Sequence, residues 1–315
     1  MLSRRLLRIK VMHILYAYFN AESPDFSKYE KELQYSINKS YDLYHFLLSL
    51  MLDIRRFIDL KQDQAKTKRI LLDSDINPNT RFLDNKFLVQ LSTNIQLRDF
   101  LNVKKLSWVN HPEIIKNLYN SIQCSEYFTE YMSLETSDYD QDKKFISNIY
   151  EHIIVNDEEL YNALEEMSIY WNDDVEFVIS MILKTIKSFK ENDSISAKLM
   201  PLYKNTDDKE FIIQLFKKTI ANSIENTKLI DSYIKNWEID RIAFMDILIM
   251  QLAITEAVEF SSIPIKVTLN EYIDIAKFYS TAKSGTFING VLDKIFADLK
   301  KNKKIVKRGL GLVGD

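Results

Sequence analysis

The scarcity of glycine and proline is the feature that most limits what this sequence can fold into. The 315 residues contain 5 glycines and 5 prolines, and Gly309, Gly311 and Gly314 stand close to the end. Sheets joined by tight turns repeatedly need residues with positive φ, which glycine adopts most easily. The sequence therefore predicts an all-α fold. Its apolar content of 46% is sufficient for one large or two ordinary domains.

The charge balance argues against a general affinity for nucleic acid. The formal net charge is −3, so any nucleic-acid site must be a local basic patch. The single cysteine, Cys124, excludes an intramolecular disulfide and is typical of a reducing compartment. Because no base is recognisable beside it, we expect Cys124 to be a small buried side chain rather than a nucleophile.

The most apolar window does not predict a membrane span. Residues 242–258 are interrupted by Asp246, Gln251 and Glu256, and the window is shorter than the roughly 20 residues that a spanning helix needs. The first residues lack the apolar core and small-residue cleavage site of a secretory signal. We therefore expect 242–258 to be a central core helix of a soluble, cytoplasmic protein with no membrane partner.

Apolar residues recur with helical spacing along most of the chain. They predict a first helix at about 3–21 and, after Pro24, a second helix capped by Ser27. The apolar stripe of the second helix is expected to contain Tyr35, Leu43, Phe46, Leu47 and Leu50. Further helices are expected at about 82–101, 112–134, 139–155, 157–170, 173–190, 208–235, 239–258, 266–279 and 286–300.

Two turn-rich stretches interrupt this helical pattern. Residues 61–81 are charged and rich in turn formers, which indicates a connector, and residues 190–208 are the best candidate for a domain boundary. The expected organisation therefore has three parts, namely an amino-terminal helical region at 1–205, a carboxy-terminal helical domain at 206–301 and a flexible basic tail at 302–315.

Signatures of catalysis are missing from the sequence. It contains no phosphate-binding glycine loop and no nucleophile elbow, and its four histidines are scattered. Asp42 and His45 have the i, i+3 spacing that di-metal bundles use, but a second carboxylate–histidine pair is missing. An ordinary helix-surface pair is the favoured interpretation. We expect no enzymatic activity, no cofactor and no metal.

The first helix carries a compact positive patch. Arg4 and Arg8 are one turn apart on one helix face, Arg5 lies alongside, and Tyr16 follows two turns beyond Arg8. Cations that hold phosphates, together with an aromatic ring that stacks a base, are the minimum for binding single-stranded nucleic acid. The alternative is a basic helix face that is merely solvated.

The stretch "KSGTFING" forms the second candidate site. Gly285 is expected to permit a strained turn, and Thr286 to cap the following helix, whose free N–H groups beside Lys283 would attract a phosphate. Phe287 in the first turn is a candidate for stacking on a base. Gly290 lies inside the helix and is expected to mark the close approach of another helix. The alternative is a plain helix–turn–helix joint with Phe287 in the core.

Two runs near the end of the chain resemble a known family. "KVTLNE" (266–271) and "FINGVLDK" (287–294), in this order and spacing, resemble the carboxy-terminal half of the bacterial antitermination factors of the NusB family. The opening "SRRLLRIKVMHILYAY" (3–18) is similar to the arginine-rich first helix of that family. Further residues in step with its pattern are Arg241, Ile242, Asp246, Ile249, Leu252, Ala253, Glu256, Ile263, Pro264, Asp274, Ala276, Lys277 and Ser284.

The resemblance implies a NusB-like helical bundle with additional helices inserted after the first helix. It implies a transcription antitermination factor that binds single-stranded, boxA-type RNA together with the ribosomal protein NusE. This would promote processive rRNA transcription by the elongation complex. The RNA contacts carried over from the family are Arg4, Arg5, Arg8, Tyr16, Lys283, Ser284 and Phe287. The acidic contact to NusE carries over to Asp246, although an internal partner such as Arg241 or a nearby lysine is equally compatible with an acid in an apolar helix.

The sequence also departs from the family pattern. Gln251 stands where the family usually has arginine, Thr286 replaces a lysine, and Lys283 occupies a position that is often acidic. These changes leave the RNA sequence preference open. The largest departure is residues 23–205, which are far longer than the usual connection in the family.

Two other functions were weighed against RNA binding. A helical protein-interaction scaffold could retain the NusB fold without binding RNA, and its function would then lie in residues 23–205. An RNA-modifying enzyme would need a cofactor-binding α/β domain, for which the sequence has too few glycines. To test the RNA site, Arg8→Glu is expected to weaken RNA binding without unfolding the protein. If short U-rich RNA still binds when Arg8→Glu is combined with Phe287→Ala, the proposed site is wrong.

Overall fold

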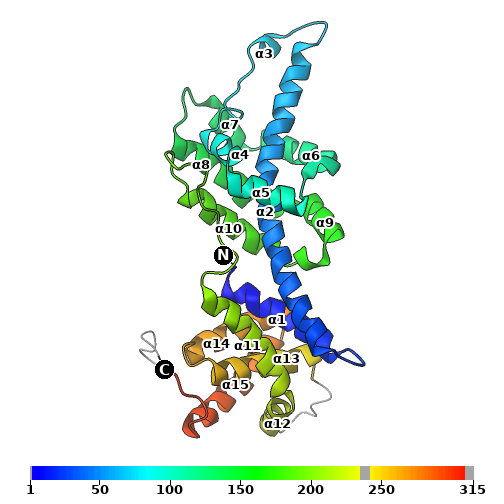
Figure 1. The fold of residues 1–315 in the computed structure, drawn as a ribbon, viewed down its shortest axis with the longest axis vertical. Helices are drawn as coiled ribbons and strands as arrows, with labels where there is room; N and C mark the ends of the chain where they lie inside the picture. Colours follow the sequence, from blue (N-terminus) through cyan, green and yellow to red (C-terminus); the bar gives the residue numbers. More distant parts are fainter. Residues whose placement is uncertain (1, 235–241, 309–315) are drawn as a thin grey trace. The chain divides into compact units, whose positions relative to one another are not determined.

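The computed structural model describes residues 2–234 and 242–308, and every regular element in these ranges is a helix (Figure 1). This confirms the predicted all-α class. The described chain forms two compact units. The insertion unit consists of Leu2 and Ser36–Leu202, and the terminal unit consists of Ser3–Tyr35 and the described residues from Tyr203 onward. The limits 1–205, 206–301 and 302–315 remain our prediction for the domains, and the structure adds that the first helix belongs with the carboxy-terminal helices.

The terminal unit is built around one apolar helix. Its elements are α1 (Arg4–Phe19), the first part of α2 (Phe26–Lys66), α11 (Thr206–Ala221), α12 (Ser223–Tyr233), α13 (Phe244–Glu259), α14 (Ile265–Tyr279) and α15 (Ser284–Lys301). Contacts run from α13 to α1, α11, α12, α14 and α15, and every residue from Leu248 to Ala257 is buried. This places α13 at the core, as expected for 242–258. Arg241, one of the residues in step with the family pattern, lies outside the described residues.

The first helix packs into this unit because its apolar residues recur on one side. The Ser3 hydroxyl caps α1 by accepting a hydrogen bond from the Leu6 amide. Leu6, Leu7, Val11 and other apolar residues of α1 are fully buried, and α1 contacts both α11 and α13. Burial of each large aliphatic side chain contributes about 1.5–3 kcal/mol relative to exposure. This packing fixes the direction in which the arginines of α1 point.

The insertion unit contains the remainder of α2 and shorter helices. These are α3 (Asp73–Ile76), α4 (Lys86–Ser92), α5 (Ile95–Lys104), α6 (Pro112–Gln123), α7 (Glu126–Ser133), α8 (Tyr139–Asn148), α9 (Glu158–Met167) and α10 (Val175–Ser188). Three predicted helices are each divided in two, where Asn94 caps α5, Ser125 caps α7 and Asn222 separates α11 from α12. The Asn94 and Ser125 side chains accept hydrogen bonds from free amides of the new helix and so interrupt an apolar pattern, whereas Asn222 makes no such side-chain bond.

The second helix differs from its prediction in three ways. It is capped by Asp25, whose carboxylate accepts hydrogen bonds from the Ser27 and Lys28 amides, so Ser27 is not the cap. It continues to Lys66, into the expected connector, because no helix-breaking residue precedes Thr67. Tyr35 is 48% exposed and does not belong to the apolar stripe, whereas the predicted stripe residues from Leu43 to Leu50 are buried.

The core of the insertion unit corrects two expectations about single residues. Asp42 and His45 are both buried rather than a surface pair: Asp42 lies near Lys39 and Lys104, and the His45 ring stacks on Phe100 at 3.6 Å. Within the described residues, no group of three or more potential metal ligands is brought together. Cys124 is exposed, because it ends α6 instead of facing the core.

The beginning of the expected tail is packed against the terminal unit. Ile305 is 6% exposed, the Lys307 ammonium donates to the carbonyl of Phe260, and the Arg308 amide donates to the carbonyl of Ser261. Residues 309–315 lie outside the described part of the chain. Among the described helices, none combines the length and the apolarity that crossing a bilayer requires.

Candidate nucleic-acid interface

The arginines of α1 all face acidic side chains. Arg4 pairs with Asp208 of α11 at 2.8 Å, and Arg5 pairs with Glu271 and Asp274 of α14 at 2.9 and 3.0 Å. The side chains of Arg4 and Arg5 remain 38% and 37% exposed, so each keeps a solvent-facing edge. Ion pairing with Glu271 raises the pKa of Arg5. The patch is therefore partly neutralised by its own protein.

Arg8 is enclosed and has no surface with which to contact RNA. Its side chain is 3% exposed, and it donates to both carboxylate oxygens of Glu256 at 2.7 and 2.8 Å. Burial alone would lower the pKa of Arg8, but the hydrogen bonds and charge of Glu256 raise it above its usual value. The resemblance implied that Arg8 contacts RNA, but the enclosed position of its side chain does not allow a direct contact. The expected placement of Arg4 and Arg8 on one face is correct, since both guanidinium groups lie near the ring of Phe211.

The corner between α14 and α15 is held by hydroxyl groups around Asp246. The Asp246 carboxylate accepts hydrogen bonds from the Ser280 and Ser284 hydroxyls. The Ser284 hydroxyl also accepts a hydrogen bond from the Thr281 amide. Asp246 is 6% exposed and Ser284 is fully buried. Asp246 thus has internal partners among the hydroxyls of this corner. Ser284 closes the corner and does not present its hydroxyl to RNA, which corrects a second carried-over contact.

Neither interior glycine has the role that the sequence predicted for it. Gly285 is buried in the first turn of α15, and a Cβ added there would lie 3.4 Å from Lys277 Cγ of α14. It therefore marks the close approach of two helices and not a strained turn. Around Gly290 a Cβ would find open space, so no neighbouring helix requires glycine there. Thr286 is exposed within α15, which begins at Ser284, so Thr286 is not the cap.

Aromatic contacts connect the second half of α1 with this corner. The ring of Tyr16 lies 5.6 Å from that of Phe244 at the start of α13, and the ring of His13 lies 5.2 Å from that of Tyr279 at the end of α14. Tyr16 is 43% exposed and Phe244 is 39% exposed. Tyr279 directly precedes Ser280, whose hydroxyl bonds to Asp246, and His13 lies one turn before Tyr16 on the same face of α1. The structure therefore brings Tyr16 to the side of the corner.

The corner itself presents one cation and one aromatic side chain. Lys283 is exposed and, in the described part of the chain, no carboxylate lies within ion-pair distance of it. Phe287 follows one turn later in α15 and is half-buried, so part of its ring faces solvent. By contrast, Arg5 is eleven residues before Tyr16 on α1, about 16 Å along the helix axis. Of the residues in the predicted site, Tyr16 and Lys283 are exposed, and Phe287 is half-buried.

Two further aromatic residues were missed by the sequence reasoning. Phe244 forms an exposed ring pair with Tyr16, and Phe278 of α14 is 82% exposed. A signal for Phe278 existed in the sequence. It falls four and seven positions after the carboxylates Asp274 and Glu271, so it stands on the polar face of its helix. An aromatic residue on a polar face has no packing role there, and this was overlooked.

We use the name corner surface for Tyr16, Phe244, Phe278, Lys283 and Phe287. Aromatic rings beside a cation that has no carboxylate partner among the described residues are suited to a flexible polyanion with planar bases, since exposed rings can stack bases and the cation can bind phosphate. The ion-paired Arg4 and Arg5 can add weaker attraction along α1. The arrangement is less basic than the sequence suggested, because three arginines are engaged by acids.

Comparison with known proteins identifies the carboxy-terminal part of the chain. Residues 176–297 match the sequence model of the NusB family. This confirms the resemblance, and the matched range includes nearly all of α10 in the insertion unit, α11 to α14, and most of α15. The match does not extend to α1, although the structure places that helix in the same unit.

Three curated relatives carry the name transcription antitermination protein NusB. The protein from Salinibacter ruber is 46% identical over 90 residues, which cover 29% of this chain and 56% of the relative. Those from Chloroherpeton thalassium and Natranaerobius thermophilus are 43% and 42% identical over 94 and 80 residues, covering 29% and 24% of this chain and 44% and 58% of the relatives. The chain thus spans about half the length of the curated relatives it matches. No solved structure matches.

Proposed function

We propose, from the NusB-family domain that residues 176–297 carry, that this chain is a non-enzymatic transcription antitermination factor. It binds single-stranded, boxA-type RNA together with the ribosomal protein NusE and promotes processive rRNA transcription by the elongation complex. The observation that carries the proposal is the corner surface, where Tyr16, Phe244 and Phe278 are exposed and Lys283 has no carboxylate partner among the described residues. The names of the relatives support the same class of function.

Within this proposal, Lys283 binds phosphate and the rings of Tyr16 and Phe287 stack bases. Arg4 and Arg5 contribute long-range attraction through their exposed edges. Arg8 and Ser284 take an indirect part, since Arg8 fixes α1 on α13 and Ser284 fixes the corner on Asp246. Stacking of one base on an aromatic side chain contributes about 1–3 kcal/mol.

The proposed contact to NusE is also indirect. The Asp246 carboxylate already accepts hydrogen bonds from Ser280 and Ser284, so it shapes the corner that a partner protein would meet. We expect Asp246→Asn to retain the fold and to weaken NusE binding by loosening this corner. A pull-down with purified NusE, with thermal unfolding of the same variant as a control for folding, measures the two effects separately. Undiminished binding of NusE would contradict this role.

A mobility-shift titration tests the RNA proposal. A short U-rich single-stranded RNA is titrated with and without NusE at two salt concentrations, because phosphate contacts make affinity fall as salt rises. Lys283→Glu is expected to weaken binding and to reduce the salt dependence. The matched control is Lys228→Glu on α12, an exposed lysine with no carboxylate partner in the described residues.

The control lies well away from the corner. α12 packs against the opposite end of α15, where Tyr233 bonds to Asp298. That end is about 22 Å along the helix axis from Lys283. Equal weakening by Lys283→Glu and Lys228→Glu would show that only total charge matters and that the corner is not the site.

A protein-interaction scaffold remains the second candidate because Arg4, Arg5 and Arg8 are all paired with acids. It predicts that no RNA is retained at moderate salt, with or without NusE. The same titration distinguishes the two functions, since retention of RNA by the unaltered protein excludes the scaffold reading.

A further inference from the structure

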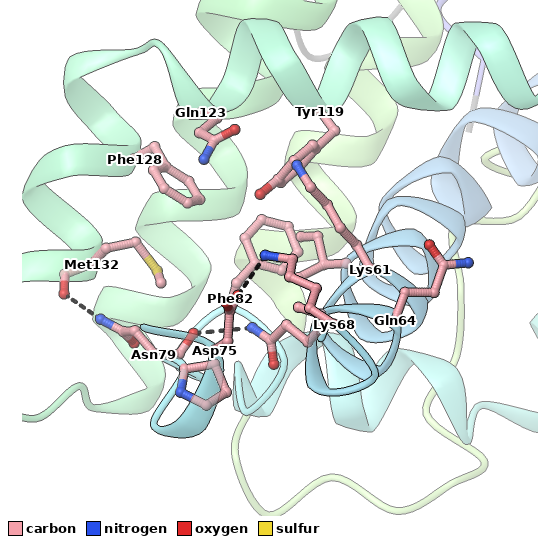
Figure 2. A pocket seen from close by; sticks show the side chains of 14 residues that line it. Lys61, Gln64, Lys68, Asp75, Asn79, Phe82, Tyr119, Gln123, Phe128 and Met132 are labelled. Carbon is pink, nitrogen blue, oxygen red and sulfur yellow. Dashed lines mark hydrogen bonds and ion pairs between the residues drawn. The ribbon is translucent and has the colours of Figure 1, made fainter. Parts of the chain in front are cut away.

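The insertion unit contains a cavity that has no part in the proposed RNA site. It has a volume of about 540 Å³ and lies between the end of α2, the segment around α3, and helices α6 and α7 (Figure 2). All of its lining residues belong to the insertion unit. Pockets for small ligands have volumes of about 300–1,000 Å³ and are mostly apolar with a few converging polar groups.

Part of the cavity wall is apolar, and polar and charged side chains line the rest. Ile58 and Phe82 are buried, and Phe128 and Met132 are half-buried and face the same space. Figure 2 shows Phe128 and Met132 on the side opposite Lys61. One side of the frame is fixed, because the Asn79 side-chain amide donates to the carbonyl of Met132 at 2.9 Å. These side chains form an apolar surface, and the Asn79–Met132 hydrogen bond holds one side of it in place.

The charged groups of the lining do not cancel. Lys68 is neutralised by Asp75, whose carboxylate oxygen lies 2.8 Å from the ammonium nitrogen. The hydrogen bond from Lys68 lowers the pKa of Asp75, so this carboxyl stays ionised. The remaining charged group is Lys61, and in the described chain no carboxylate lies within ion-pair distance of it. The lining therefore carries one uncompensated positive charge.

Polar groups without partners converge near Lys61. Its ammonium nitrogen lies 4.7 Å from the ring centroid of Tyr119, which keeps the cation at the cavity (Figure 2). The Tyr119 hydroxyl makes no hydrogen bond within the described residues, although the residue as a whole is only 6% exposed. The side-chain amide of Gln123 also lacks a partner there. A cation, a hydroxyl donor and an amide thus border one apolar space.

We propose that this cavity binds a small amphipathic anion, an aryl or acyl group that carries one carboxylate, sulfonate or phosphate. The anionic group accepts hydrogen bonds from Lys61 and Tyr119, and the apolar body lies against Phe82, Phe128 and Met132. The proposal does not depend on RNA binding, because none of these residues belongs to the corner surface. It gives the insertion unit a ligand-binding role of its own.

A pair of fluorescent probes tests the proposal on the full chain. 8-Anilinonaphthalene-1-sulfonate has an aryl body with a sulfonate, and N-phenyl-1-naphthylamine has the same body without the charge. We expect one saturable site for each probe. Lys61→Met keeps the length of the side chain and removes its charge, so it should weaken the sulfonate probe about tenfold and leave the uncharged probe unchanged.

The controls separate this site from general surface charge. Lys116→Met removes an exposed lysine on α6 that does not line the cavity, and it should change neither affinity. Tyr119→Phe retains the ring and should weaken only the sulfonate probe. Lys61 is exposed, so Lys61→Met is compatible with folding, and far-ultraviolet circular dichroism checks this for each variant.

Three results would overturn the proposal. They are the lack of a saturable site, equal weakening by Lys61→Met and Lys116→Met, and equal weakening of the charged and uncharged probes by Lys61→Met. The last result would mean that the cavity binds apolar groups without selecting an anion.

Discussion

Arg8 of α1 and Glu256 of α13 form an enclosed ion pair across a sequence separation of 248 residues. Glu256 also accepts hydrogen bonds from the hydroxyls of Thr268 and Tyr272, at 2.9 and 3.1 Å, so both of its oxygens are fully used. Burial raises the pKa of Tyr272, and the charge of Glu256 raises it further. This network fastens the first helix to the carboxy-terminal helices of the terminal unit.

Arg8→Met should destabilise the protein by about 3–5 kcal/mol, because it leaves the Glu256 charge buried without its partner. Arg8→Glu should be more damaging still, since it places two carboxylates together, and it is therefore not the clean test of RNA binding that the sequence suggested. The free energy of unfolding in urea measures both effects. Combining Arg8→Met with Glu256→Gln should recover part of the loss. A loss below about 1 kcal/mol for Arg8→Met would contradict the enclosed pair.

Gly290→Ala should stabilise the protein by about 0.5–1 kcal/mol, because alanine restricts the unfolded chain and favours the helix more than glycine does. The added methyl group meets open space in the structure. Gly285→Ala should gain less, since its methyl group would press against Lys277 Cγ. Thermal unfolding of the two variants side by side gives the comparison. Destabilisation by Gly290→Ala would reveal a neighbour that the structure does not contain.

Acidification should destabilise the insertion unit through His45. Burial lowers the pKa of His45 to about 4 from 6.5, although the carbonyl of Tyr41 and the charge of Asp42 act in the opposite direction and Lys104 adds to the lowering. The unfolded chain therefore binds a proton between about pH 6.5 and pH 4 while the folded protein does not. Stability falls across this window by up to about 3 kcal/mol as the pH decreases.

A variant without an imidazole at position 45 isolates this contribution. His45→Leu should be less stable than the unaltered protein at neutral pH, because it loses the hydrogen bond to the Tyr41 carbonyl. Its stability should decline less steeply from pH 6.5 to pH 4, as measured by urea unfolding at several pH values. Replacement of the exposed His152 by glutamine controls for the loss of one imidazole. Equal slopes for His45→Leu and the unaltered protein would refute the prediction.

Phe278→Ala should weaken RNA binding about fivefold or more without changing its salt dependence, because a ring stacks bases and bears no charge. The exposed Ile224 of α12 provides the matched control, and Ile224→Ala should leave the affinity unchanged. Both affinities come from the mobility shift with U-rich RNA. Full affinity of Phe278→Ala would remove this residue from the site, while the proposed function would still stand if Lys283→Glu weakens binding.

Local signals in the sequence predicted much of the fold. The scarcity of glycine predicted the all-α class. Apolar residues at helical spacing, a signal that extends over a few residues, predicted α1, the core helix α13 and the pair α14 and α15. The breaks at Asn94, Ser125 and Asn222 were missed. A capping residue ends a helix at one position. The apolar periodicity is judged over many residues, so it does not reveal such a single break.

The sequence by itself determined which residues supply charge and rings, and the "FINGVLDK" run indicated the NusB resemblance that the family model matches at residues 176–297. Only the tertiary structure decided which of these groups remain available. Arg4, Arg8 and Lys283 are all cations in the sequence, yet two of them face acids from helices more than 200 residues away. The free energy of a charge depends on the partners and the solvent around it, and distant segments provide both only after the chain has folded.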